Sequence, residues 1–97
     1  MFDIRISDNG EVLLAGRFDA SRVETAKTVF DQLEKSSVVD FKDLEYISSA
    51  GLSVLLATQK RLSESDHSLK LKNMSKHIRD VFRYAGFDMV FEIEQSA

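Results

Sequence analysis

The chain has 97 residues, which is enough for one small domain with a single core and too few for two ordinary domains. Its formal net charge is −3, charged residues of both signs are interspersed, and it contains no cysteine and two histidines, His67 and His77. These features exclude a disulfide framework and a structural zinc site, and they leave no basic stripe for nucleic acid. We therefore expect no nucleic acid partner, no metal and no cofactor.

The N-terminal segment gives no sign of targeting. It lacks the basic and long apolar stretches of a signal peptide, and no run of about eighteen apolar residues occurs in the sequence. We therefore expect a cytoplasmic protein with no membrane partner. The start at Met1 favours a stand-alone chain that forms one domain over residues 1–97.

A β-hairpin is predicted at the start of the chain. Apolar residues alternate with polar ones over residues 2–6, which is the period of a half-buried strand. The sequence DNG at residues 8–10 supplies a turn, and residues 11–15 continue as a second strand. The alternation stops after residue 15, where we expect this strand to end.

The first helix and a central strand are predicted next. Ser21 and Glu24 have the spacing of a capping box, and apolar residues at three- and four-residue steps carry a helix to about Lys35. Residues 37–41 (SVVDF) are β-branched and apolar, as expected of a strand inside a sheet. Residues 42–48 are predicted to form a loop.

The rest of the chain alternates between helices and strands. A second helix is predicted from the pair Ser48-Ser49 to about Ser65. The remaining elements are a strand over residues 68–72, a third helix capped by Ser75 and ending near Gly86, a last strand over residues 87–93, and a frayed end over residues 94–97. This order predicts an α/β domain with a mixed, mostly parallel sheet of about five strands and helices packed on it.

Two motifs resemble one known family. Residues 43–56 (DLEYISSAGLSVLL) resemble the signature of the STAS domain, the family of bacterial anti-sigma factor antagonists. Residues 16–19 (GRFD) resemble the family's Gly-x-hydrophobic-Asp step before its first helix. The order of elements also matches that family over the whole chain except the last few residues, so the resemblance implies a STAS fold.

The resemblance implies a partner switch. In that family, a kinase-type anti-sigma factor phosphorylates the serine that stands two residues before the glycine, which here is Ser49. The unmodified antagonist binds this serine kinase, phosphorylation ends the binding, and a phosphatase restores it. Ser48 stands where the family often has aspartate and is the alternative acceptor, whereas Ala50 replaces a hydroxyl that relatives can have.

The serine pair also has a purely structural interpretation. Serine is a favoured N-cap and stabilises a helix there by about 1 kcal/mol. A helix N-terminus also has unpaired N–H groups and partial positive charge, so it can hold a phosphate. One hydroxyl can cap the helix while the other accepts phosphate.

Further partner-binding candidates surround the pair. Gly51 is expected to let the kinase approach closely. The helical spacing of Leu52 favours the core, although the resemblance also allows it to reach the partner, and Ser53 is the better exposed contact. Asp19 is either close to the serine loop, at the end of the sheet where loops gather, or only an N-cap.

The sequence allows two alternatives to the switch to be considered, a hydrolase and a scaffold. The nucleophile elbow of a hydrolase has the pattern Gly-x-Ser-x-Gly, but here Ile47 stands two residues before Ser49. Neither histidine is placed to serve as the catalytic base. We therefore expect no enzyme activity. The remaining alternative is a STAS scaffold or sensory-complex subunit that is not phosphorylated and acts through protein–protein contacts.

Overall fold

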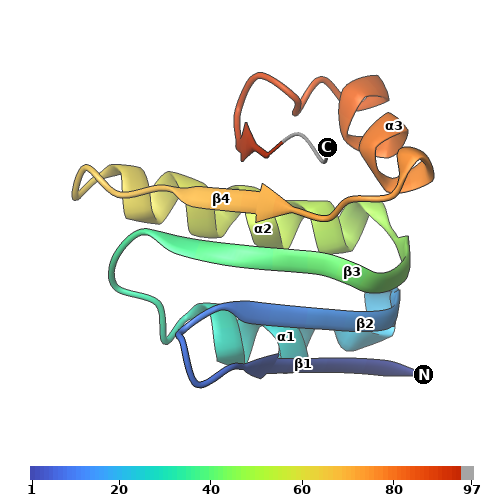
Figure 1. Cartoon of the computed structure of the whole chain (residues 1–97), viewed down its shortest axis with the longest axis horizontal. Coiled ribbons are helices and arrows are strands. Elements are labelled where there is room, and N and C mark those ends of the chain that lie inside the picture. The colour runs from blue at the N-terminus through green and yellow to red at the C-terminus, as the bar shows by residue number, and fades with distance from the viewer. Residues whose placement is uncertain (95–97) are drawn as a thin grey trace.

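The computed structural model describes residues 1–94, which contain one five-stranded sheet with the strand order β1-β2-β3-β4-β5 (Figure 1). The strands are β1 (Phe2–Ile6), β2 (Val12–Phe18), β3 (Ser37–Ile47), β4 (Leu69–Lys72) and β5 (Glu92–Ile93). β1 pairs antiparallel with β2, and the other neighbouring pairs are parallel. The predicted α/β class with a mixed, mostly parallel sheet is confirmed.

Within residues 1–94, three α-helices and one short 3-10 helix connect the strands. They are η1 (Ala20–Arg22), α1 (Val23–Phe30), α2 (Ser49–Ser63) and α3 (Lys76–Tyr84). α1 and α2 lie behind the sheet in the view of Figure 1, and α3 lies at the β5 side. In this part of the chain, no helix is long and apolar enough to cross a membrane.

The core fills the space between the helices and one face of the sheet. In β4, Leu69 and Leu71 are fully buried, whereas Lys72 points to the opposite face. Phe41 of β3 packs edge-on against Phe82 of α3, with ring centroids 5.8 Å apart. Since side chains in a strand alternate between faces, this pattern gives the sheet one apolar face and one polar face.

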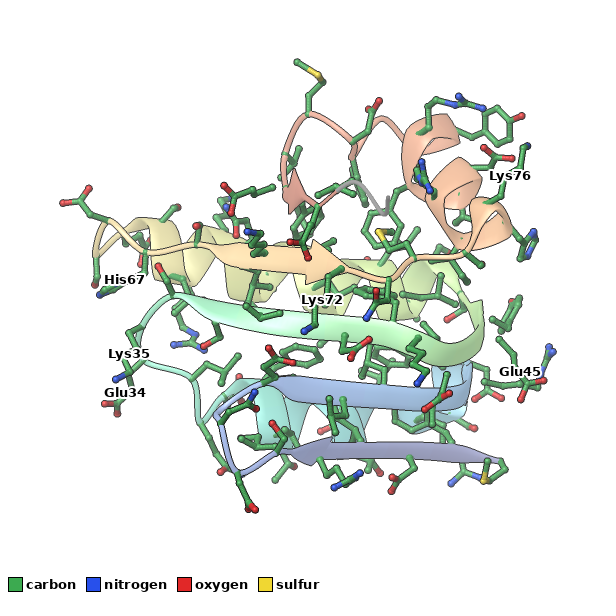
Figure 2. All side chains as sticks on the ribbon, viewed as in Figure 1. Glu34, Lys35, Glu45, His67, Lys72 and Lys76 are labelled. Atoms are coloured by element: carbon green, nitrogen blue, oxygen red, sulfur yellow. The ribbon has the colours of Figure 1, made fainter. Side chains whose placement is uncertain are left out.

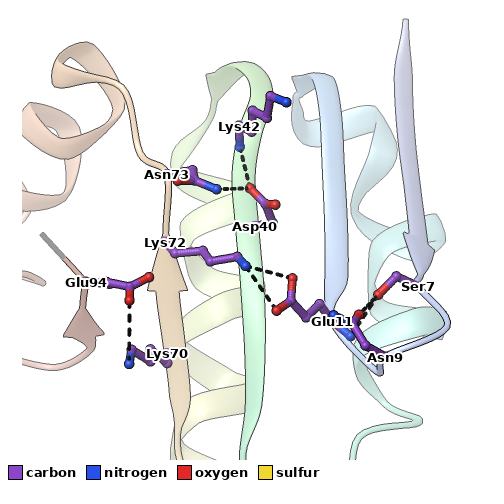
Figure 3. Close-up of polar contacts among 9 residues, drawn as sticks. All are labelled: Ser7, Asn9, Glu11, Asp40, Lys42, Lys70, Lys72, Asn73 and Glu94. Carbon is purple, nitrogen blue, oxygen red and sulfur yellow. Dashed lines mark hydrogen bonds and ion pairs between the residues drawn. The ribbon is translucent and has the colours of Figure 1, made fainter. Parts of the chain in front are cut away.

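Polar contacts cover the open face of the sheet (Figure 3). The Lys72 ammonium lies 3.0 Å from a carboxylate oxygen of Glu11, across β3. The hydrogen bond with Glu11 raises the pKa of Lys72 above its ordinary value. On β3, Asp40 accepts a hydrogen bond of 3.1 Å from the amide nitrogen of Asn73. No helix covers this face in Figure 1.

Two strands are longer than their predictions. β2 continues past residue 15 to Phe18, and β3 runs through residues 42–47, where a loop was predicted. Both predictions were wrong because the register of β2 against β3 shifts twice, so the alternation of apolar residues is interrupted while the pairing continues. One of these shifts occurs at Gly16.

Gly16 allows the chain to bend inside a paired strand. Its φ is +83°, a left-handed conformation that residues with a side chain rarely adopt. A Cβ at this position would also collide with the carbonyl oxygen of Met1, the residue directly before β1. The glycine therefore serves both the bulge and the close approach of β1.

The first helix differs from its prediction at both ends. The capping box of Ser21 and Glu24 does not form: the chain starts with η1, whose N-cap is Asp19, and Arg22 precedes α1 without a side-chain cap. α1 then ends at Phe30 rather than near residue 35. The apolar spacing beyond residue 30 reflects core packing of the following turn rather than further helix.

Arg61 of α2 closes the C-terminal end of α1. Its guanidinium donates hydrogen bonds of 3.0 Å to the carbonyl of Phe30 and 2.9 Å to the carbonyl of Leu33. These bonds satisfy the carbonyl of Phe30, the last residue of α1, and that of Leu33 in the turn that follows the helix. They also tie the two helices together next to the sheet.

The C-terminal half largely follows its predictions. Ser75 caps α3 by accepting a hydrogen bond of 3.2 Å from the Ile78 amide, as predicted. α2, β4 and α3 lie within two residues of their predicted bounds. The last strand is much shorter than predicted because residues 87–90 form a turn, closed by a hydrogen bond of 3.0 Å from the Val90 amide to the Phe87 carbonyl. The fraying predicted for residues 94–97 falls mainly on 95–97, which lie outside the described residues.

Replacing Gly16 tests the importance of the bulge, and Gly10 offers a matched control. Both have positive φ, but a Cβ on Gly10 would meet no atom within 4 Å. We expect Gly10→Ala to lower the free energy of unfolding by about 1 kcal/mol through backbone strain alone. Gly16→Ala should cost at least about 1–3 kcal/mol more because of the collision with Met1. Urea unfolding of both variants measures these free energies. Equal losses of stability in the two variants would contradict the role of Gly16 in the close packing of Met1.

Candidate functional site

The candidate site lies where β2 and β3 end side by side. Phe18 and Ile47 are register partners, and they are the last residues of the two parallel strands. The Ser48 amide then donates a hydrogen bond of 2.9 Å to the Phe18 carbonyl. Asp19 and Ser48 therefore leave the sheet next to each other, at the carboxyl edge where loops of parallel strands gather.

Ser48 is the N-cap of α2. Its backbone is extended, with φ −85° and ψ 168°, and its hydroxyl oxygen accepts a hydrogen bond of 3.1 Å from the Gly51 amide. Its carbonyl accepts the amide of Leu52 at 2.9 Å, which is the first bond of the helix. The half-buried Ser48 side chain is thus engaged in capping.

Ser49 is the first residue of α2, and its side chain is exposed. Its hydroxyl makes no hydrogen bond with any other residue among 1–94, although its carbonyl accepts a bond of 3.0 Å from the Ser53 hydroxyl. The Ser49 hydroxyl therefore stands free at the positive end of a helix of fifteen residues.

Gly51 and Leu52 face the interior. A Cβ on Gly51 would lie 2.9 Å from Cγ1 of Ile47 and 3.1 Å from Cγ of Phe18. The missing side chain lets α2 pack closely on the ends of β2 and β3, where the glycine is buried. Leu52 is 6% exposed and belongs to the core, as its helical spacing predicted.

Asp19 combines the two alternatives given by the sequence. Its carboxylate caps η1, accepting hydrogen bonds of 2.6 Å from the Ser21 hydroxyl and 3.1 Å from the Ser21 amide. The hydrogen bond from the Ser21 side chain holds the pKa of Asp19 below its ordinary value, with help from the charges of Arg22 and Arg17. Asp19 therefore carries a negative charge at the same edge as the serines.

Two residues of this edge were missed by sequence reasoning. The guanidinium of Arg17 lies over the ring of Tyr46, 4.3 Å from its centroid. The two are register partners in β2 and β3, so only the pairing brings them together. Both residues lie within the two motifs that resemble the STAS family, and this position is the signal by which the sequence could have identified them. Glu45, next to Tyr46, points away from the sheet at this end (Figure 2).

A groove between α1 and α2 begins beside the serines. It has a volume of about 540 Å³. The residues that line it are Val23, Glu24, Lys27 and Asp31 from α1, and Ala50, Ser53, Val54, Ala57, Thr58 and Arg61 from α2. Three of the lining residues on α2, Ala50, Ser53 and Ala57, have small side chains and leave space along this side of the helix. We call these residues the α1–α2 groove.

The site has few groups for catalysis. In the described part of the chain, no cluster of three or more histidine, cysteine or carboxylate residues could hold a metal ion. His67 precedes β4, and its Nδ1 atom lies 3.3 Å from the hydroxyl of Ser36. Neither histidine forms a hydrogen bond with Ser48 or Ser49. What the arrangement provides is a free hydroxyl at a helix N-terminus, next to a shallow groove.

The sequence matches one family model and two curated relatives. The model of the STAS_2 family, described as Mlab, STAS domain, matches residues 2–93. BtrV of Bordetella bronchiseptica, named as a candidate anti-sigma factor antagonist, is 39% identical over 66 residues, which cover 68% of this chain and 57% of BtrV. The anti-sigma-B factor antagonist of Bacillus subtilis is 26% identical over 95 residues, covering 94% of this chain and 87% of that protein.

The fold is also similar to solved structures of SpoIIAA, an anti-sigma factor antagonist. Its unphosphorylated form has a TM-score of 0.72 and 17% identity, with 100% of this chain and 90% of that chain covered. The Bacillus protein in its phosphorylated form has a TM-score of 0.69 and 18% identity, covering 99% and 93%. With the family model matching residues 2–93 and the serine motif at the start of a helix, as predicted, the chain belongs to the STAS domain family.

Proposed function

We propose that this chain is an anti-sigma factor antagonist in a cytoplasmic partner switch. In its unphosphorylated form it binds a serine-kinase anti-sigma factor, and phosphorylation of Ser49 by that kinase ends the binding. A phosphatase then removes the phosphate and restores the binding. The observation that carries the proposal is the free, exposed hydroxyl of Ser49 beside a neighbour, Ser48, that is engaged as a cap.

The names of the relatives support the regulatory part of this proposal. Two matched proteins are named as anti-sigma factor antagonists, one of them as a candidate. SpoIIAA, whose fold is similar, has been solved in an unphosphorylated and a phosphorylated form. A switch by covalent phosphate is therefore compatible with this fold.

The geometry at Ser49 supports the choice of acceptor. The first N–H groups of α2 and its dipole favour a negative group at this position, so the helix can carry the phosphate with little rearrangement. Ser48 would have to give up its bond to the Gly51 amide before its hydroxyl could react. We therefore place the phosphate on Ser49.

The loss of binding follows from charge at an interface. Phosphorylation adds roughly −1.5 to −2 charge and three acceptor oxygens. Ser49 directly precedes Ala50, which lines the α1–α2 groove together with Ser53, and a partner packed there would have to desolvate the phosphate. A penalty of about 3 kcal/mol already weakens binding more than a hundredfold.

Charge substitutions on α2 test the switch. The chain is titrated by calorimetry with the serine-kinase anti-sigma factor of its own organism. We expect Ser49→Asp to weaken binding at least about a hundredfold and Ser49→Ala to leave it within about threefold, because only the aspartate imitates the modified state. Ser63→Asp is the control for added negative charge, since Ser63 is exposed at the far end of the same helix. Binding that is insensitive to Ser49→Asp would instead favour a scaffold that is not switched by phosphate.

Alanine substitutions separate the cap from the acceptor. Ser48→Ala removes the bond to the Gly51 amide, so we expect it to lower the free energy of unfolding by about 1 kcal/mol. Ser49→Ala removes a hydroxyl without a partner in the described chain and should change that free energy by less than about 0.5 kcal/mol. Thermal and urea unfolding measure both values, and the reverse order would show that we have exchanged the roles of the two serines.

A further inference from the structure

The outer edge of β1 is unpaired within the described chain. β1 is the first strand in the sheet order, and no helix extends beyond it in Figure 1. The five residues pair with β2 without a register shift, so the strand is regular along its length. An unprotected, regular edge strand is a template for pairing with another chain. The other edge strand, β5, has two residues.

The hydrogen bonds to β2 show which groups point outward. The Arg17 amide donates to the Met1 carbonyl at 2.7 Å, and the Ser7 amide donates to the Glu11 carbonyl at 2.8 Å. In an antiparallel pair the bonded positions recur at every second residue, so the odd-numbered residues of β1 bond to β2. The N–H and C=O groups of Phe2, Ile4 and Ile6 therefore point to the free edge.

The side chains along this edge alternate in a regular way. Asp3 and Arg5 are exposed on the open face of the sheet, and neither forms an ion pair with another residue among 1–94. On the other face, Phe2 and Ile4 are partly buried against the core. Ile6 is 39% exposed, which is high for a large apolar side chain in a strand.

We propose that β1 pairs antiparallel with β1 of a second copy of this chain, about a twofold axis at Ile4. In this register Ile4 faces Ile4 of the other copy, and Phe2 faces Ile6. These are the positions whose main-chain groups point outward, so each pair exchanges hydrogen bonds. Asp3 then faces Arg5 of the other copy, and Arg5 faces Asp3.

The charges of Asp3 and Arg5 favour this register over the registers shifted along β1. Moving the axis to position 3 would place Asp3 opposite its own copy, and moving it to position 5 would do the same for Arg5. Like charges directly opposite one another destabilise a strand pair, whereas opposite charges stabilise it. In the proposed register the charged pair occupies the positions without hydrogen bonds, where facing side chains come closest. The strand FDIRI is thus complementary to itself in one register.

The dimer would join two sheets into one continuous sheet. Both helical layers would lie on the same face, and Ile6 would gain an apolar neighbour in Phe2 of the other copy. Pairing through five residues buries less than the roughly 1,000 Å² of a specific stable interface, so the association should be weak and depend on concentration. This inference is independent of the proposed function, because the β1 edge contains none of the site residues.

Charge exchange at two positions tests the dimer. Sedimentation velocity is measured for the wild type, Asp3→Arg, Arg5→Asp and the double variant over about 10 µM to 1 mM. Each single variant places like charges opposite one another, so its dissociation constant should rise at least about tenfold. The double variant restores opposite pairs and should associate like the wild type. An equimolar mixture of the two single variants should also associate, since each carries the charge that the other lacks.

Because both side chains are exposed, the variants should keep the wild-type fold, which circular dichroism and melting temperature check. A wild type that stays monomeric at 1 mM would overturn the proposal. So would single variants that dimerise as well as the wild type, since that dimer would use a different surface. Failure of the mixture of single variants to associate would also contradict the register.

Discussion

The structure depends on the parallel pairing of β2 and β3 through to their last residues. The pair Phe18 and Ile47, followed by the bond from the Ser48 amide to the Phe18 carbonyl, fixes where both chains leave the sheet. α2 must then begin at this edge, with its unpaired amides directed outward. Gly51 completes the arrangement, because any side chain there would push the helix away from the sheet. The place of Ser49 follows from these constraints.

The two adjacent serines have different surroundings because of their helix positions. An N-cap residue has an extended backbone, which turns its side chain back toward the free amides, and Ser48 uses this geometry. The next residue is already helical, so the Ser49 side chain projects outward. A phosphate on this side chain would remain close to the helix dipole without disturbing the cap. The charge of the surface could therefore change while the fold is kept, which is what a reversible switch of partners needs.

Local patterns predicted much of the fold. The strand alternation at Leu69 and Leu71, the cap Ser75 and a helix start at the serine pair depend on neighbours in the sequence, and the structure has them as expected. The bulge at Gly16 was misinterpreted as the end of a strand, because a shift in register looks like a loss of period. The closure of α1 by Arg61 was not predictable, since its partners lie 28 and 31 residues away.

In the candidate site, too, local features were predicted and features that depend on distant residues were not. The family motif located the serine pair, but it could not show which hydroxyl is engaged, because that depends on the exact start of α2. The contact between Arg17 and Tyr46 required the register of two strands. Gly51 was expected to face a partner, whereas its tertiary surroundings show that it serves the packing of the helix on Phe18.

The position of the phosphate tests the proposed switch most directly. The chain is incubated with ATP and the serine-kinase anti-sigma factor of its own organism, digested, and analysed by tandem mass spectrometry with fragmentation between the two serines. We expect one phosphate, on Ser49, and the same product from the Ser48→Ala variant. Phosphate on Ser48, or no phosphate at either serine, would contradict the proposed role of Ser49.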